Sequence, residues 1–213
     1  MIKGKIMELH LQTLKALNKY LSAKKHIRYE LNSVLVEITE DQTFYVATDG
    51  HKMCMFKHAT YPSDDIQTGE YVINTDAINV FSKSTSHLVK FTVSEVIDHT
   101  LSDGITTFTY KSSDYKYPNW RQLLHKVKQL SGKTSNLQPE NLKSVFDCYR
   151  MSVGLKKDSL CLALSQNGSD ACLVTASGDP NFVGIVMPYR TDESKHTFDF
   201  DSWLPNQPIK KAA

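Results

Sequence analysis

Residues 131–134, Ser-Gly-Lys-Thr, end like a phosphate-binding loop, in which glycine N–H groups and a lysine hold nucleotide phosphates. The first glycine of that pattern would stand at position 127, where the chain has Val127. The eight histidines form no His-Glu-x-x-His pair, and no Gly-x-Ser-x-Gly segment presents a serine nucleophile. We therefore predict no catalytic residue and no cofactor.

Carboxylates offer another route to catalysis, through a bound divalent metal. Asp98, Asp103 and Asp114 fall on different expected strands and turns, and no motif supports them. A magnesium-dependent nuclease is thus the weaker, enzymatic alternative. The four cysteines stand far apart without a Cys-x-x-Cys pair, so their spacing predicts neither a zinc site nor a disulfide framework.

Basic residues gather on and just after the first expected helix. Contact with a nucleic-acid backbone needs closely spaced cations and no base-reading side chain, although a solvated helix face has the same composition. The net charge of +2 neither requires nor excludes a polyanionic partner. The cluster comprises Lys15, Lys19, Lys24, Lys25 and Arg28.

A repeated pattern of elements positions these residues. Apolar spacing predicts helices over residues 11–22, from 75 to about 84 and from 139, and the three starts are evenly spaced. Three strand-like runs follow each helix. These are residues 31–38, 43–48 and 53–57, then 87–93, 95–101 and 105–110, then 160–164, 171–176 and 182–187. We predict an α+β fold of about three βαβββ units.

The composition, with 40% hydrophobic and 23% charged residues among 213, excludes disordered and collagen-like classes. The N-terminus lacks an apolar core for an export signal, and no apolar run approaches the ~18 residues that span a bilayer. We therefore expect a soluble, cytoplasmic protein without a membrane partner.

Four short segments are common when taken one at a time, but their occurrence together and in one order along the chain is specific. They are Arg-Tyr-Glu-Leu-Asn at 28–32, Ala-Thr-Asp-Gly-His-Lys-Met at 47–53, Tyr-Pro-Asn-Trp-Arg at 117–121 and Val-Met-Pro-Tyr-Arg at 186–190. On these segments the sequence resembles the bacterial sliding clamp family, the β subunit of DNA polymerase III. Residues 5 to about 127 resemble its middle domain, and residues 137–191 resemble the second half of its last domain.

The resemblance implies a DNA-clamp fold with helices on one side and antiparallel sheets on the other. It also suggests the division of the chain. The expected parts are a clamp-like domain of two units at 1–127, a linker at 128–136, a half domain at 137–191 and a tail at 192–213.

In the family, partners insert a short linear peptide into an apolar pocket between the middle and last domains. Leucine, methionine, valine and proline supply apolar anchoring surface for such a peptide. Gln122 stands where the family usually has a cation, and Tyr189 where it has a smaller or flexible residue. By position, the pocket comprises Leu31, Thr48, Gly50, His51, Lys52, Met53, Pro118, Gln122, Leu123, Val186, Met187, Pro188, Tyr189 and Arg190.

The resemblance also implies that the helices and a loop after the first helix touch DNA. Asp147 lies between two of the matching cations and weakens their positive field. The matching residues are Lys15, Lys19, Lys24, Lys25, Arg28, Tyr29, Lys143 and Arg150.

These expectations support two functions. One is a replication processivity factor, encoded by a phage or another mobile element, that binds double-stranded DNA non-specifically and tethers a polymerase or repair protein. Whether this function needs a clamp loader, and whether several copies of the chain assemble, is left open. The alternative is a monomeric regulator that captures clamp-binding peptides without forming a ring. The acidic and aromatic residues 198–205 of the tail could fill the pocket, cover a sheet edge or bind another clamp.

Overall fold

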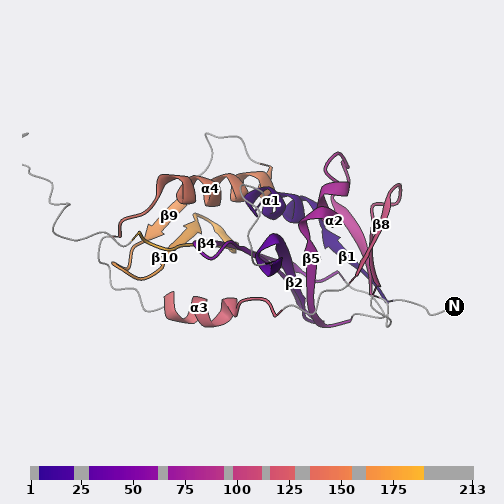
Figure 1. Cartoon of the computed structure of the whole chain (residues 1–213), viewed down its shortest axis with the longest axis horizontal. Coiled ribbons are helices and arrows are strands. Elements are labelled where there is room, and N and C mark those ends of the chain that lie inside the picture. The colour runs from indigo at the N-terminus through magenta and orange to yellow at the C-terminus, as the bar shows by residue number, and fades with distance from the viewer. Residues whose placement is uncertain are drawn as a thin grey trace, which may run out of the picture.

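The computed structural model describes residues 5–21, 29–61, 67–93, 98–111, 116–127, 135–154 and 162–189. These residues form an elongated molecule with two antiparallel sheets, and helices cover both faces of the longer sheet (Figure 1). The α+β fold of the sequence prediction is confirmed.

The elements follow the expected repeat. The first unit contains β1 (Lys5–His10), α1 (Leu11–Leu21), the short 3₁₀ helix η1 (Tyr29–Asn32), β2 (Ser33–Ile38), β3 (Gln42–Thr48) and β4 (Lys52–Ala59). The second contains β5 (Gly69–Asn74), α2 (Thr75–Val80), β6 (Leu88–Val93), β7 (Asp98–Ser102) and β8 (Thr107–Lys111). After α3 (Trp120–Val127), the third contains α4 (Pro139–Val153), β9 (Leu162–Ser165), β10 (Cys172–Ala176) and β11 (Asp179–Val186).

The three helix starts predicted at 11, 75 and 139 are confirmed, but several boundaries differ, and β11 begins three residues earlier than expected. The second helix ends at Val80, because a run rich in serine and threonine, residues 82–86, follows the cap residue Phe81. The strand expected from 105 begins at Thr107, because Asp103 Oδ1 accepts the backbone N–H groups of Ile105 and Thr106 in a turn. In the third unit, residues 135–138 approach α4 without forming a strand. The expected boundaries of the linker stay predictions, because residues 128–134 lie outside the described ranges.

The longer sheet joins segments that are distant in the sequence. Its strand order is β5-β2-β3-β4-β11-β10-β9, and the shorter sheet has the order β1-β6-β7-β8. In the longer sheet β4 pairs antiparallel with β11, so that Met53 lies opposite Ile185. The first and third units therefore share one continuous sheet.

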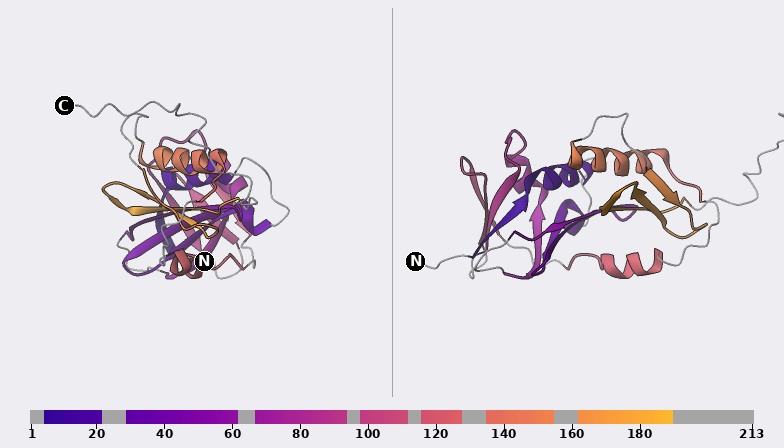
Figure 2. Two further views of the ribbon diagram at one scale, coloured as in Figure 1. Left: turned by 90° about the vertical axis from the view of Figure 1, so that its left-hand side faces the viewer. Right: turned by 180° about the vertical axis from the view of Figure 1, so that it is seen from behind.

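Both faces of the longer sheet are covered. Helices α1 and α4 lie side by side along one face, here called the helix face, and α3 lies on the opposite, outer face (Figures 1 and 2). Tyr149 of α4 packs on Phe182 of β11 with ring centroids 4.5 Å apart. Gly184 permits this approach, since an added Cβ would lie 2.5 Å from Cγ1 of Val145.

A stacked histidine pair links the end of β1 to β4. The rings of His10 and His58 lie 3.9 Å apart between centroids, and Nε2 of His58 is 3.0 Å from the hydroxyl of Thr13. That hydroxyl is in turn 3.2 Å from the hydroxyl of Ser152 on α4. Burial lowers the pKa of His58 to about 4. The charge of His10 adds a smaller decrease, and the charge of Asp179 opposes both.

We therefore expect acid to destabilise the fold through this pair. Since the folded pKa of His58 is below its ordinary 6.5, the unfolded chain binds more protons as the pH falls from 6.5 to about 4. The stabilisation is complete above 6.5 and is lost in that window. Urea unfolding should show a smaller loss between about pH 7 and about pH 5 in His58→Gln than in the unaltered protein. The exposed control His87→Gln should keep the full loss, and equal losses in all three proteins would contradict the role of the pair.

Candidate functional site

Strand register assembles an apolar layer on the outer face. Met53 of β4 pairs with Thr48 of β3 and Ile185 of β11, and Ile185 pairs with Leu173 of β10. Two residues along each strand, the next row of side chains that points to the outer face comprises Val46, Met55 and Val183. Because alternate residues of a strand point to opposite faces, the residues between these rows face α1 and α4.

Helix α3 covers part of this layer. Trp120, only 7% exposed, lies against Phe44 with ring centroids 5.5 Å apart. The guanidinium of Arg121 lies 4.1 Å from the Trp120 ring and forms an ion pair with Glu37 of β2. Just before the helix, the hydroxyl of Tyr117 donates to the carbonyls of Ser33 and Val46.

Sequence reasoning missed α3, although a signal for it is present. Asn119 precedes the helix, and its Oδ1 accepts the backbone N–H of Gln122 at 3.0 Å. An asparagine in this place is a preferred N-cap. The helix was not expected because it lies outside the repeat, between the second and third units.

Several predicted pocket residues meet at one end of the longer sheet. The backbone N–H of Met187 donates to the carbonyl of His51 at 2.8 Å, which places the end of β11 beside the β3–β4 turn. Leu31 lies beneath that turn, 4.0 Å from where Gly50 would carry a Cβ. His51 and Gly50 are exposed, and the exposed fractions of Met187 and Tyr189 are 37% and 60%.

Other predicted pocket residues lie near this end. Thr48 and Met53 are buried in the outer layer, and Leu123 of α3 packs against that layer. Pro118 and Gln122 are exposed around the start of α3, and Pro188 is partly buried after β11. Arg190 lies outside the described residues.

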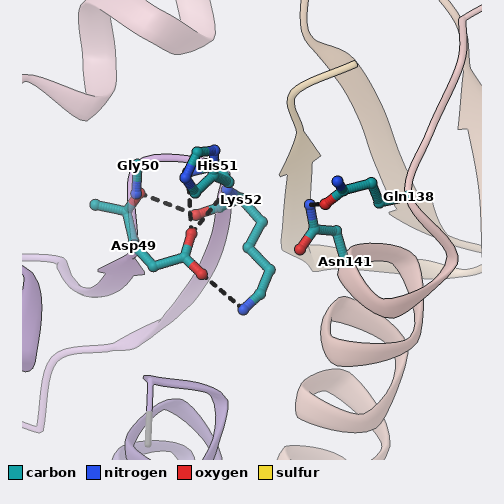
Figure 3. Close-up of polar contacts among 7 residues, drawn as sticks. Asp49, Gly50, His51, Lys52, Gln138 and Asn141 are labelled. Carbon is teal, nitrogen blue, oxygen red and sulfur yellow. Dashed lines mark hydrogen bonds and ion pairs between the residues drawn. The ribbon is translucent and has the colours of Figure 1, made fainter. Parts of the chain in front are cut away.

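The β3–β4 turn is held by Asp49 (Figure 3). Oδ1 of Asp49 accepts the backbone N–H groups of His51 and Lys52, both at 3.0 Å, and Oδ2 lies 2.8 Å from the ammonium of Lys52. Burial by itself would raise the pKa of Asp49, but these hydrogen bonds and the lysine charge outweigh it and hold the pKa below its ordinary value. Gly50 completes the turn with a φ of 87°.

Two predicted pocket residues point to the helix face instead. Lys52 is only 5% exposed, and its ammonium lies 4.4 Å from the centre of the Tyr20 ring on α1. Val186 is fully buried in the core that α1 and α4 share with the sheet. On β11 it is Ile185, which the sequence reasoning did not select, that belongs to the outer layer.

A groove of about 520 Å³ opens on the outer face beside α3. Met55 and Val183 line it, together with the paired residues Phe44 and Lys57, which lie farther along the strands from the end of the sheet where the predicted pocket residues gather. Its apolar lining includes Phe44, Met55, Trp120, Leu124, Leu173 and Val183. Lys57, Arg121 and His125 add polar groups. No local pattern of residues indicates this groove, because its walls come from β3, β4, α3, β10 and β11.

The predicted DNA-contact cations occupy the helix face where the structure describes them. On α4, Asp147 forms ion pairs with both Lys143 and Arg150. The ammonium of Lys15 donates to the carbonyl of Ser84, and burial lowers the pKa of Lys15 against a smaller, opposing effect of Asp103. Lys19 is exposed on α1.

The remaining predicted cations, Lys24, Lys25 and Arg28, lie outside the described residues, and Tyr29 is described only as the backbone start of η1.

Within the described ranges, no three histidine, cysteine, aspartate or glutamate side chains are grouped as metal ligands. In the same part of the chain, no helix has the length and apolarity needed to span a membrane.

Comparisons with known proteins identify the fold. No family model and no curated protein matches the chain. Among solved structures it is similar to the DNA polymerase III subunit beta of Pseudomonas aeruginosa, with 19% identity and a TM-score of 0.62 over 90% of this chain and 68% of that one. The sliding clamp of Bacillus subtilis matches at 15% identity and a TM-score of 0.64, over 89% of this chain and 65% of the clamp.

The DNA polymerase III beta subunit of Thermotoga maritima matches at 13% identity and a TM-score of 0.62, over 89% and 66% of the two chains. The chain thus has the sliding-clamp fold and spans about two thirds of the length of these clamps.

Proposed function

We propose that this chain, having the fold of a bacterial sliding clamp, is a non-catalytic accessory protein of DNA replication. In this proposal the helix face associates with duplex DNA through its phosphates. The end of the sheet around His51 and Met187 captures short peptide motifs of a polymerase or repair protein. The observation that supports it best is that α1 and α4, the helices that carry Lys19 and Lys143, cover one face of the longer sheet, whereas an apolar layer lies on the opposite face (Figure 2).

Lys19→Ala tests the DNA face. Because each phosphate contact releases counterions, loss of one lysine contact should reduce the slope of log affinity against log salt by about 1. Fluorescence anisotropy with a labelled duplex of mixed sequence, at several salt concentrations, measures that slope. Lys90→Ala is the matched control, since Lys90 is exposed on β6 in the shorter sheet. An unchanged slope for Lys19→Ala would count against the helix face.

A monomeric, peptide-capturing regulator is the second candidate. It is favoured by the ion pairs of Asp147 with Lys143 and Arg150, which reduce the positive potential of α4. Light scattering across a range of protein concentrations distinguishes the two candidates. A defined oligomer supports a ring-forming factor, whereas a persistent 24.1 kDa monomer supports the regulator.

Met187→Ala tests peptide capture, which both candidates share. We expect about tenfold weaker binding of a fluorescent peptide that carries the clamp-binding motif of a bacterial replicative polymerase, because an exposed apolar anchor is lost. Val153→Ala is the control, since Val153 on α4 is 39% exposed, much as Met187 is. Equal affinities for the two variants would argue that the peptide binds elsewhere.

A further inference from the structure

We propose that the groove beside α3 holds the chain's own segment 198–203, Phe-Asp-Phe-Asp-Ser-Trp. This groove is distinct from the end of the sheet assigned above to partner peptides. The proposal therefore does not depend on DNA binding or on partner capture.

The chemistry of the groove fits an aromatic segment. Its walls combine Phe44 and Trp120 with aliphatic and methionine side chains, and methionine adapts readily to aromatic rings. Its volume of about 520 Å³ falls in the range of about 300–1,000 Å³ that ligand sites have. An extended segment would place Phe198 and Phe200 on one side and the intervening aspartates on the other.

Charge complementarity supports the same occupant. Lys57 lines the groove, is partly buried and forms no ion pair within the described part of the chain. Arg121 adds a second cation at the start of α3, although Glu37 already pairs with it. Asp199 and Asp201 bring two negative charges close to the aromatic rings. A carboxylate of the segment beside Lys57 would therefore give this lysine the ion-pair partner that it lacks among the described residues.

The length of chain allows the segment to reach the groove. Val183 lines the groove, and Tyr189 is the last described residue. At about 3.3 Å per residue the chain between them covers at most about 20 Å. The connection from Tyr189 to Phe198 can span about 30 Å when extended. The segment can therefore turn back and run along the outer face with length to spare.

A competition experiment on the full-length protein tests the proposal. The probe is a fluorescein-labelled synthetic peptide of residues 196–206, and its binding is followed by anisotropy. One protein is unaltered, and the other carries Phe198→Ser, Phe200→Ser and Trp203→Ser. A tethered segment competes at an effective concentration in the millimolar range, so the probe should bind the triple variant at least about tenfold more tightly.

A charge reversal locates the bound probe. In the triple-variant background, Lys57→Glu should weaken probe binding at least about fivefold, whereas Lys111→Glu on the exposed strand β8 should leave it unchanged. Equal binding to the unaltered protein and the triple variant would overturn the proposal. A probe affinity that Lys57→Glu does not change would also overturn it. A third contrary result would be a dimer that the unaltered protein forms and the triple variant does not, because the segment would then bind to a second copy.

Discussion

Replacing Asp49 with alanine is expected to lower the free energy of unfolding by about 3–5 kcal/mol. The reason is that Lys52 is 5% exposed and Asp49 is the carboxylate that its ammonium contacts in the described structure. Without Asp49, a buried ammonium and the backbone N–H groups of His51 and Lys52 lose their acceptor. Urea denaturation followed by circular dichroism measures the loss.

The matched control for this change is Asp147→Ala. Asp147 also forms ion pairs, but its side chain is 35% exposed, so its removal should cost at most about 1 kcal/mol. Removing the charge of Lys52 instead, in Asp49→Ala with Lys52→Met, should recover most of the stability, since no buried charge is then unpaired. A loss in Asp49→Ala no larger than in the control would show that the turn does not depend on this pair.

The same network has a dependence on pH that the variant should lack. Since the pKa of Asp49 is held below its ordinary 3.8, its contribution is complete above that value and falls as the pH drops through the folded pKa. The difference in stability between the unaltered protein and Asp49→Ala should therefore shrink in acid.

Trp120→Ala is expected to cost about 3–5 kcal/mol, the range for truncating a buried tryptophan. Trp120 is 7% exposed and packs on Phe44, Arg121 and the outer layer, so its removal takes away the main apolar contact of α3 with the sheet. Trp120→Phe keeps an aromatic ring and should lose less than half as much. Denaturation with a far-ultraviolet readout avoids dependence on tryptophan fluorescence.

Gln122→Ala is the control for Trp120→Ala on the same helix. Gln122 is exposed, so its truncation should change the free energy of unfolding by no more than about 0.5 kcal/mol. If Trp120→Ala is as mild as this control, α3 is held by its flanking chain instead of by the tryptophan.

The order of each repeat helix and the three strands after it could be read from the sequence, because that order depends on local patterns. Helical spacing and Pro139 marked the start of α4, and polar turns such as Ser177-Gly178 separated the strands. The face to which each strand residue points could not be read in the same way. A strand buried on both sides is apolar throughout, so its alternation is hidden.

Two residues show how this limited the prediction of the site. Lys52 would be assigned to a solvent-facing rim from its charge, but Asp49 three residues earlier allows it to be buried against Tyr20. Val186 and Ile185 are equally apolar, and only the pairing of Ile185 with Met53 shows which one faces α3. Predicting the groove would also have required α3, because this helix forms one of its walls and its position over the sheet has no counterpart in the repeat.

The pairing of β4 with β11 also has a consequence for how the chain folds. During synthesis β4 emerges more than a hundred residues before β11, as the positions of Lys52 and Val186 show. Until then β4 has one unpaired edge, and its apolar sequence Met-Cys-Met-Phe could pair with another nascent chain. Such non-local pairing slows folding, because a long loop must close before the contact forms. The completion of this sheet is therefore the step at which folding and aggregation compete.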